Sequence, residues 1–502
     1  MRINEIKIGI VLSYINIILN TIINIMYVPL LLYYIGKNEY GIYQLVGSFI
    51  AYFNVLDFGL TAAIIRFYIK YKVENNKKGI ENILAISMRG YLIITFFLCL
   101  VGFVIYFNIE YIFSYSMTDK ELLSLKNIFL LLLFNIVITM STMIFKAIIN
   151  ADEKFLVLKG LESIQIIFQP ILVILFLQEY KNAFSVALAQ TIVNLVLSII
   201  RIYYCFYKLN IKIKFHYWDN KLFKDFRKLA FSTFFVMIVD QIFFKTNQII
   251  LGIIEGSVAV AIYAIASIIY TNYMTLATSI SGMYLPYIVE LVTKEEMKKV
   301  SNLFISIGRW QYFLLGVISG GFFIFGRRFI NLWAGKGFED AYWIALLIII
   351  PLTVDLIQNI GLSILQAQNK YGFRAKVYFF MGIFNLCLAI PLGLKYGGIG
   401  CAFATGLSMF IGNGLIMNWY YLKITKLEIG QFWKNIGRIT IGVIIVTIIG
   451  YVFNGMIEDK NIIVFIMKLL VYTLLYVGIM YKFFMNIEEK SKIKNLVLKF
   501  KR

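Results

Sequence analysis

Charged residues are scarce in this chain: they make up 15% of its 502 residues, whereas hydrophobic residues make up 60%. Apolar runs of about 20 residues recur along it, and a helix of that length crosses the hydrocarbon core of a bilayer. Such runs are too long for the cores of soluble domains, and little sequence remains between them. The composition therefore excludes a set of soluble domains and predicts an integral membrane protein.

Histidine and cysteine are also rare. The single histidine, His216, falls in a predicted cytoplasmic loop. The four cysteines lie singly in or beside apolar runs, at Cys99, Cys205, Cys387 and Cys401. Neither type shows the spacing of a metal site or a nucleophile–base pair, and the predicted outer loops are too short to hold catalytic groups. We expect no metal, no cofactor and no catalytic residue, which argues against a polysaccharide polymerase or ligase.

The apolar runs are separated by short breaks that collect Gly, Asn, Lys and Glu. This pattern predicts an all-α fold with about fourteen transmembrane helices. The fifth run contains Pro170 among polar residues and is a candidate for a kink, so counts of twelve or thirteen stay open. The predicted spans are residues 8–35, 41–66, 82–107, 122–149, 156–178, 183–207, 229–252, 258–288, 302–326, 341–366, 376–395, 398–421, 434–454 and 462–484.

A net charge of +21 raises the possibility of nucleic-acid binding, so the positions of the basic residues matter. With the N-terminus inside, most of the 48 Lys and Arg residues fall in predicted cytoplasmic segments, and the largest group lies between Arg201 and Lys228. This is the positive-inside pattern of membrane proteins. Both termini are predicted to be cytoplasmic, and the charge requires no nucleic acid as a partner.

The chain resembles itself at a separation of about 220 residues. Ile42-Tyr43 matches Ile262-Tyr263, and Arg89 matches Arg309, both at a separation of 220. Spans one to six therefore pair with spans seven to twelve, and the last two spans are an addition. Because six is even, the two six-helix lobes are parallel, and a substrate path is expected between them.

The predicted organisation follows from this repeat. We expect an N-lobe, a basic cytoplasmic linker, a C-lobe, two further helices and a basic tail whose spacing predicts an amphipathic helix lying on the membrane surface. Their predicted bounds are residues 1–207, 208–228, 229–425, 426–485 and 486–502.

Several short segments carry a resemblance to a known family. They are Tyr-Gly-Ile-Tyr at 40–43, Leu-Asp-Phe-Gly-Leu at 56–60, Ile250–Ala266, Leu365–Lys376 and Gly-Gly-Ile-Gly-Cys-Ala at 397–402. Together they are similar to the bacterial polysaccharide flippases of the multidrug/oligosaccharidyl-lipid/polysaccharide (MOP) exporter superfamily. The resemblance implies translocation of an undecaprenyl-diphosphate-linked oligosaccharide from the inner to the outer leaflet of the cytoplasmic membrane, by alternating access. It also implies membrane lipids and glycan-assembly proteins as partners.

One departure from the family pattern concerns ion coupling. An acidic residue is expected just before residues 249–252, but Asn247-Gln248 stands there. This questions coupling to H⁺ or Na⁺ at that point of the chain.

The seventh predicted span carries the densest polar face. Its polar residues recur near heptad spacing and predict one wall of a wet cavity. The alternative is a set of hydrogen bonds between helices, with Asp240 paired to Lys245 or another cation. They are Thr233, Asp240, Gln241, Lys245, Asn247 and Gln248.

Arg89 and Arg309 lie near the starts of the third and ninth spans. Their repeated position suggests two guanidinium groups that bind a diphosphate together with Lys245, because the planar fork forms bidentate bonds. The alternative is that both snorkel to the cytoplasmic interface.

Four further polar residues are candidates for gating or coupling. The resemblance places Asp57 in the cavity and Arg66 at its cytoplasmic mouth, although Arg66 also suits an interfacial anchor. Glu162 and Asp355 lie on polar helix faces that either line the path or join helices. These acids keep a cation-coupled multidrug exporter open as an alternative, and a lipid-linked peptidoglycan precursor fits the same cationic interior.

Overall fold

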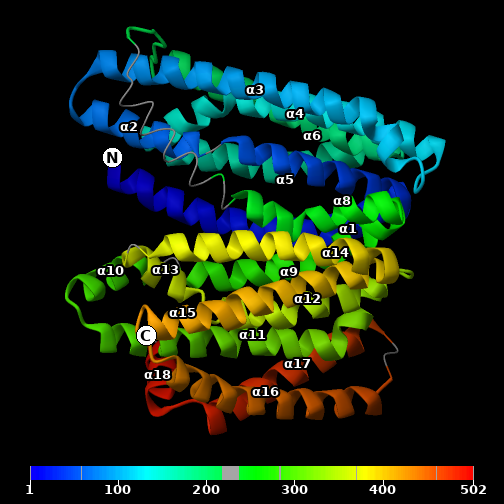
Figure 1. The fold of residues 1–502 in the computed structure, drawn as a ribbon, viewed down its shortest axis with the longest axis vertical. Helices are drawn as coiled ribbons and strands as arrows, with labels where there is room; N and C mark the ends of the chain where they lie inside the picture. The colour runs from blue at the N-terminus through cyan, green and yellow to red at the C-terminus, as the bar shows by residue number, and fades with distance from the viewer. Residues whose placement is uncertain are drawn as a thin grey trace. The chain divides into compact units, whose positions relative to one another are not determined.

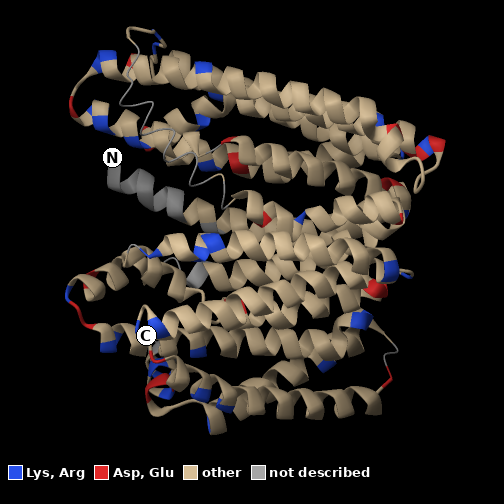
Figure 2. Ribbon diagram, in the orientation of Figure 1, with Lys and Arg blue, Asp and Glu red and all other residues tan. Residues whose placement is uncertain are grey.

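The computed structural model describes residues 2–57, 59–217, 234, 237–281, 284–368, 370–458 and 461–500. Over these ranges the chain forms helices joined by short turns, and none of them contains a β-strand (Figure 1). Charged residues gather near the helix ends, while the middles of the helices are largely uncharged (Figure 2). The predicted class, an all-α membrane protein, is confirmed. Thr233 and part of the predicted linker lie outside the described residues.

Eleven helices within the described ranges are long and apolar enough to cross a membrane. A twelfth candidate is the pair α12 (Asp340–Leu356) and α13 (Ile360–Ala367), which is bent by 42°. Each half of that pair is too short to span the bilayer alone, but together they reach the required length.

Two of the eleven helices are each interrupted by a glycine. The segment Val11–Val73 has 63 residues and would extend about 95 Å as one helix, three times the hydrocarbon thickness. Gly36 breaks it with φ 72° and ψ −178°, and Gly397 breaks the segment Tyr371–Lys423 with φ 57° and ψ −140°. Dividing both at these glycines gives fourteen candidate spans, although the exact number of crossings stays a prediction.

By its contacts the chain divides into two compact units, residues 1–264 and 265–502. In the first unit α4 packs against α3 and α6, and α1 packs against α4 and α5. Aliphatic side chains of α2, α3 and α4, such as Ile64, Ile83 and Ile148, form its main described core. The elements of this unit are α1 (Arg2–Asn54), η1 (Val55–Asp57), α2 (Leu60–Val73), α3 (Lys77–Phe113), α4 (Asp119–Ala151), α5 (Phe155–Glu179), α6 (Ala183–Tyr203), η2 (Tyr204–Lys208), α8 (Thr246–Ile254) and the start of α9 (Ser257–Ser281).

The second unit contains the rest of α9 and the following helices. In it α12 packs against α14, and α16 packs against both α11 and α17. Its further elements are α10 (Leu285–Thr293), α11 (Met297–Trp333), α12, α13, α14 (Tyr371–Met409), η4 (Phe410–Ile416), α15 (Met417–Lys423), α16 (Ile429–Met456), α17 (Ile462–Ile479), η5 (Met480–Phe484) and α18 (Ile487–Phe500).

The predicted repeat is supported by local backbone geometry. Helices α3 and α11 have 37 residues each and begin 220 positions apart. The turns that precede them contain Asn75 and Glu295, both in the left-handed region with φ of 52° and 58°. Gly36 and Gly256 also have positive φ, 72° and 86°, at the same separation. Equivalent turns at equivalent positions are expected of a duplicated six-helix unit.

The boundary between the units differs from the predicted one. Contacts divide the chain after Ala264, within α9, rather than in the linker at 208–228. The seventh span packs with the first unit because α8 contacts α1 and α3. Ser116 donates a hydrogen bond to the carbonyl of Gly252 at 2.7 Å, and Ser48 donates to Gln248.

The C-terminal tail forms the helix that the sequence predicts, but its first turn is docked. Glu489, near the start of α18, is 2% exposed and forms a buried ion pair with Arg309 of α11. The prediction of a surface helix without a specific partner is therefore corrected for this turn.

Candidate functional site

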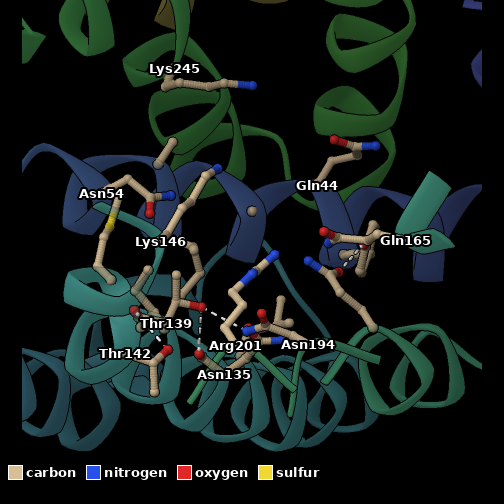
Figure 3. Close-up of a pocket in the computed structure, with 18 residues that line it drawn as sticks. Gln44, Asn54, Asn135, Thr139, Thr142, Lys146, Gln165, Asn194, Arg201 and Lys245 are labelled. Atoms are coloured by element: carbon tan, nitrogen blue, oxygen red, sulfur yellow. Dashed lines mark hydrogen bonds between the residues drawn. The ribbon is translucent and has the colours of Figure 1, made fainter. Parts of the chain in front are cut away.

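The first unit contains a polar cavity of about 470 Å³ (Figure 3). It lies among α1, α4, α5, α6 and the break that precedes α8. The residues that line it are Tyr43, Gln44, Gly47, Ile50, Ala51, Asn54, Leu132, Asn135, Ile136, Thr139, Thr142, Met143, Lys146, Gln165, Gln190, Asn194, Arg201 and Lys245. Twelve of these eighteen residues are Asn, Gln, Thr, Tyr, Lys or Arg. So many polar side chains are unusual at membrane depth and mark a wet interior.

The polar wall is built from helix periodicity. On α4, Asn135, Thr139, Thr142 and Lys146 recur at spacings of four, three and four residues, which places them on one face. Thr118 fixes the start of α4 through a capping box with Glu121. The register of this helix therefore directs one polar stripe into the cavity.

Hydrogen bonds between α4 and α6 hold this wall in place. Asn194 donates to Asn135 at 2.8 Å and to Thr139 at 2.7 Å, and Asn135 donates to Thr191 at 3.1 Å. Tyr43 of α1 donates to Gln190 at 2.7 Å on the neighbouring side. These bonds stiffen the wall between α4 and α6, so the polar groups beside it are held in place for a ligand.

Three cations, Lys146, Arg201 and Lys245, line the cavity. Arg201 is 9% exposed, and within the described residues its Nε has no hydrogen-bond partner. Figure 3 shows Arg201 and Lys146 extending into the cavity. Asp and Glu are absent from the lining residues that the structure describes. The site is therefore suited to an anion, and a buried guanidinium edge suits a phosphate oxygen.

Lys245 reaches the cavity because the seventh span is broken beside it. The residue has non-helical dihedrals (φ −122°, ψ −29°) between the helical residues 241–244 and α8. Broken helices that line a cavity are a common way to place polar groups at membrane depth. The placement agrees with the cavity wall predicted for this span.

The other polar residues of the seventh span join helices instead. Asn247 is fully buried and donates to the Tyr263 hydroxyl at 2.6 Å, while fully buried Gln248 accepts a bond from Ser48. Asp240 is half-buried and engaged with other groups, and it is not among the residues that line the cavity. For Asn247 and Gln248 the structure thus supports the alternative of interhelical bonds.

The two repeated arginines lie outside this cavity. Arg89 is exposed on α3, with its guanidinium 3.9 Å from the ring centre of Phe215. Arg309 is 4% exposed, and its Nε and Nη2 donate to the carboxylate of Glu489 at 2.6 and 2.8 Å. The fork that was expected to bind a diphosphate is occupied by a carboxylate of the chain itself.

The gating candidates Asp57, Arg66 and Asp355 are not among the residues that line the cavity. Asp57 is 8% exposed and accepts bonds from Tyr91 at 2.8 Å and Thr61 at 3.1 Å, which joins η1 to α2 and α3. Arg66 is exposed beside Phe67, with 5.9 Å between its guanidinium and the ring centre. Asp355 belongs to the second unit, where it is half-buried on α12.

Glu162 is the gating candidate that borders the cavity. Its carboxylate lies 2.8 Å from the ammonium of Lys159 and 3.4 Å from that of Lys146. It is also one turn from Gln165, which lines the cavity on the same helix. Of the ten predicted site residues, Lys245 and Glu162 are therefore the two that the structure brings to one place.

Sequence reasoning missed Lys146 and Arg201. Arg201 was assigned to a basic cytoplasmic segment and Lys146 was not singled out, although each lies inside a predicted span, 183–207 and 122–149. The usable signal was the polar stripe on α4, from Asn135 to Lys146, and the spacing of Asn194 and Arg201 on α6.

The fold is similar to that of two solved membrane transporters. A structure titled as the lipid II flippase MurJ, in an inward closed conformation, superposes with a TM-score of 0.73 at 19% identity, covering 94% of this chain and 97% of that one. An inward-facing multidrug resistance MATE family transporter of the MOP superfamily superposes with a TM-score of 0.65 at 14% identity, covering 85% and 99%. At these identities the likeness concerns the fold.

The sequence identifies the family. Residues 7–292 match the model of the family described as polysaccharide biosynthesis protein, and the chain belongs to this family. A Shigella flexneri protein whose name describes O-antigen transport is 22% identical over 397 residues, which cover 78% of this chain and 91% of that protein.

Proposed function

We propose that the protein is a flippase that moves an undecaprenyl-diphosphate-linked oligosaccharide from the inner to the outer leaflet of a bacterial cytoplasmic membrane, for surface polysaccharide biosynthesis. Membership of the polysaccharide biosynthesis family supports this proposal. The names of the Shigella relative, an O-antigen transporter, and of the MurJ structure, a lipid II flippase, point to the same class of cargo.

The observation that carries the proposal is the charge of the cavity. Lys146, Arg201 and Lys245 line it without a lining carboxylate among the described residues. A diphosphate diester bears a negative charge on each phosphate, so it matches this set, and the surrounding amides and hydroxyls suit sugar hydroxyls. The lipid tail would remain in the bilayer while the polar headgroup enters the cavity and the protein alternates its access.

Two other cargoes share parts of this chemistry. A lipid-linked peptidoglycan precursor has the same diphosphate, so only the glycan distinguishes it. A cationic drug is disfavoured, because three cations in a site of low dielectric constant repel it. The proposal includes glycan-assembly proteins as partners and H⁺ or Na⁺ as a coupling ion. Asn247-Gln248 stands where the family pattern has an acidic residue, so any coupling would use another part of the chain.

The test uses the full chain in liposomes that contain a lipid-linked oligosaccharide, with arrival in the opposite leaflet as the readout. A second set of liposomes contains lipid II in place of the oligosaccharide lipid. A third set encloses a cationic dye and tests for drug export. We expect transport of the oligosaccharide lipid, and a loss of at least tenfold in Lys146→Gln, Arg201→Gln and Lys245→Gln.

Lys126→Gln is the matched control. Lys126 lies on α4, as Lys146 does, but it pairs with Glu110 at 2.5 Å outside the cavity. We expect this variant to keep the wild-type rate. Unchanged transport in all three cavity variants, or transport of the dye alone, would overturn the proposal.

A further inference from the structure

Glu162 supplies negative charge at the edge of a cavity that otherwise presents cations. Its side chain is 24% exposed, and its carboxylate contacts Lys146, whose ammonium lines the cavity. Arg201 also interacts with Glu162 electrostatically. An anion that enters this cavity therefore meets an ammonium group, that of Lys146, that is already paired with a carboxylate of the chain.

The two ion pairs of Glu162 differ in strength. The bond to Lys159 is 2.8 Å long and joins residues of one helical turn. That turn is fixed to α1, because Asn16 donates to the Lys159 carbonyl at 3.0 Å and Ser163 donates to Asn16 at 2.6 Å. The contact to Lys146 is 3.4 Å long and joins α5 to α4. The weaker contact is the one that involves a cavity-lining residue.

We propose that Glu162 is a displaceable counter-ion of the cavity: it neutralises Lys146 in the empty protein and releases Lys146 to the diphosphate when substrate enters. This inference rests on the proposed function. The Lys146 side chain lies inside a predicted span and is 42% exposed. Exchange of one anionic partner for another keeps its ammonium paired in both states. The same competition weakens substrate binding and speeds release, because the carboxylate returns to Lys146 as the diphosphate leaves.

The first test is a binding measurement with farnesyl diphosphate, a soluble isoprenoid diphosphate, on the full chain in nanodiscs. Glu162→Gln removes the competing charge and keeps the side-chain shape. We expect its Kd for farnesyl diphosphate to fall about 3- to 10-fold. In liposomes the same variant should show a lower KM and a lower maximal rate for the lipid-linked oligosaccharide, since release becomes slower.

Lys159→Gln tests the same exchange in the opposite direction. Without Lys159, the Glu162 carboxylate keeps its ion pair with Lys146 and competes more strongly for that ammonium. We expect the Kd for farnesyl diphosphate to rise about 2- to 5-fold. If Glu162 had only a structural role, the Kd for farnesyl diphosphate would change in the same direction in Glu162→Gln and Lys159→Gln.

Glu110→Gln is the matched control, because Glu110 pairs with Lys126 on the same unit but away from the cavity. We expect its Kd to equal that of the wild type. A double variant, Glu162→Gln with Lys146→Gln, should lose the gain in affinity, because the two effects act on one ammonium.

The outcomes separate this inference from the proposed function. If the wild type binds the diphosphate and Glu162→Gln binds it equally or more weakly, the counter-ion role is overturned and the proposed function stands. If Glu162→Gln does not fold, Lys159→Gln decides. A Kd for farnesyl diphosphate that falls or stays unchanged in Lys159→Gln overturns the counter-ion role of Glu162. If neither the wild type nor any variant binds, the diphosphate site and the counter-ion are both overturned.

Discussion

The guanidinium of Arg309 holds the carboxylate of Glu489 through two hydrogen bonds, of 2.6 and 2.8 Å, across 180 residues of chain. Two further bonds go to Asn435 at 3.2 Å and to the carbonyl of Phe484 at 3.1 Å. Both charged side chains are buried. This cluster ties the start of α18 to α11 and α16, so the C-terminal tail is part of the packed second unit.

Glu489→Gln should destabilise the second unit by about 3–5 kcal/mol, because it leaves the Arg309 charge buried without a counter-ion. The measurement is the melting temperature of the full chain in detergent. The control is Glu290→Gln, which breaks an exposed pair with Lys294 at 2.5 Å, and its melting temperature should equal that of the wild type. Equal melting temperatures for both variants would contradict a stabilising role for the buried pair.

Gly41→Ala should destabilise the first unit, because α1 and α9 approach each other closely at this glycine. A Cβ atom there would lie 1.8 Å from the carbonyl oxygen of Ser257 and 3.3 Å from the backbone nitrogen of Ala261. The backbones must move apart, at a cost of about 1–3 kcal/mol, which thermal unfolding in detergent measures.

Gly90→Ala is the control for that substitution. Gly90 lies inside α3, and an added Cβ would meet nothing within 4 Å. Because alanine favours a helix interior over glycine by about 0.5–1 kcal/mol, the melting temperature should stay or rise. A similar fall in both variants would show that the close approach at Gly41 is not the cause.

Tyr91→Phe tests the hydrogen bonds of Asp57. The fully buried Tyr91 donates to Asp57 at 2.8 Å, and without this bond the carboxylate still accepts a bond from Thr61 at 3.1 Å. A buried charge that loses one donor should cost about 1–3 kcal/mol of stability. Tyr115→Phe, at a tyrosine that is 97% exposed, should leave the melting temperature unchanged.

The fold could be read from the sequence because its main determinants are local. The length of an apolar run fixes whether it can span the bilayer, and glycines such as Gly36 and Gly397 mark breaks that an L-residue adopts only with strain. The repeat also showed in the sequence, since Ile42-Tyr43 matches Ile262-Tyr263 at a separation of 220 residues. The division of the units could not be read in this way, because it depends on which neighbours α8 contacts.

The site was only partly predictable, because the partners of its charged side chains lie far away in the sequence or on another helix. Lys245 was found from the polar face of its own helix, a local pattern. The partner of Arg309 lies 180 residues away, and nothing in the sequence near Arg309 indicates Glu489. Lys146 and Glu162 are close in sequence, but their contact requires the turn between α4 and α5 to bring two helix faces together.

Arg201→Gln and Arg89→Gln compare the site that the structure shows with the site that the sequence suggested. Arg201 is buried and lines the cavity with an unbonded Nε among the described residues, so its loss removes charge-assisted bonds worth about 1.5–3 kcal/mol, or roughly 10- to 100-fold in transport. Arg89 is exposed against Phe215 and does not line the cavity, so transport should stay within about twofold of the wild type. Leaflet transfer of the lipid-linked oligosaccharide in liposomes, at equal protein content, measures both. An equal loss in the two variants would place Arg89 on the transport path, as its repeated position suggested, and a loss in Arg89→Gln alone would move the anion site away from the cavity of the first unit.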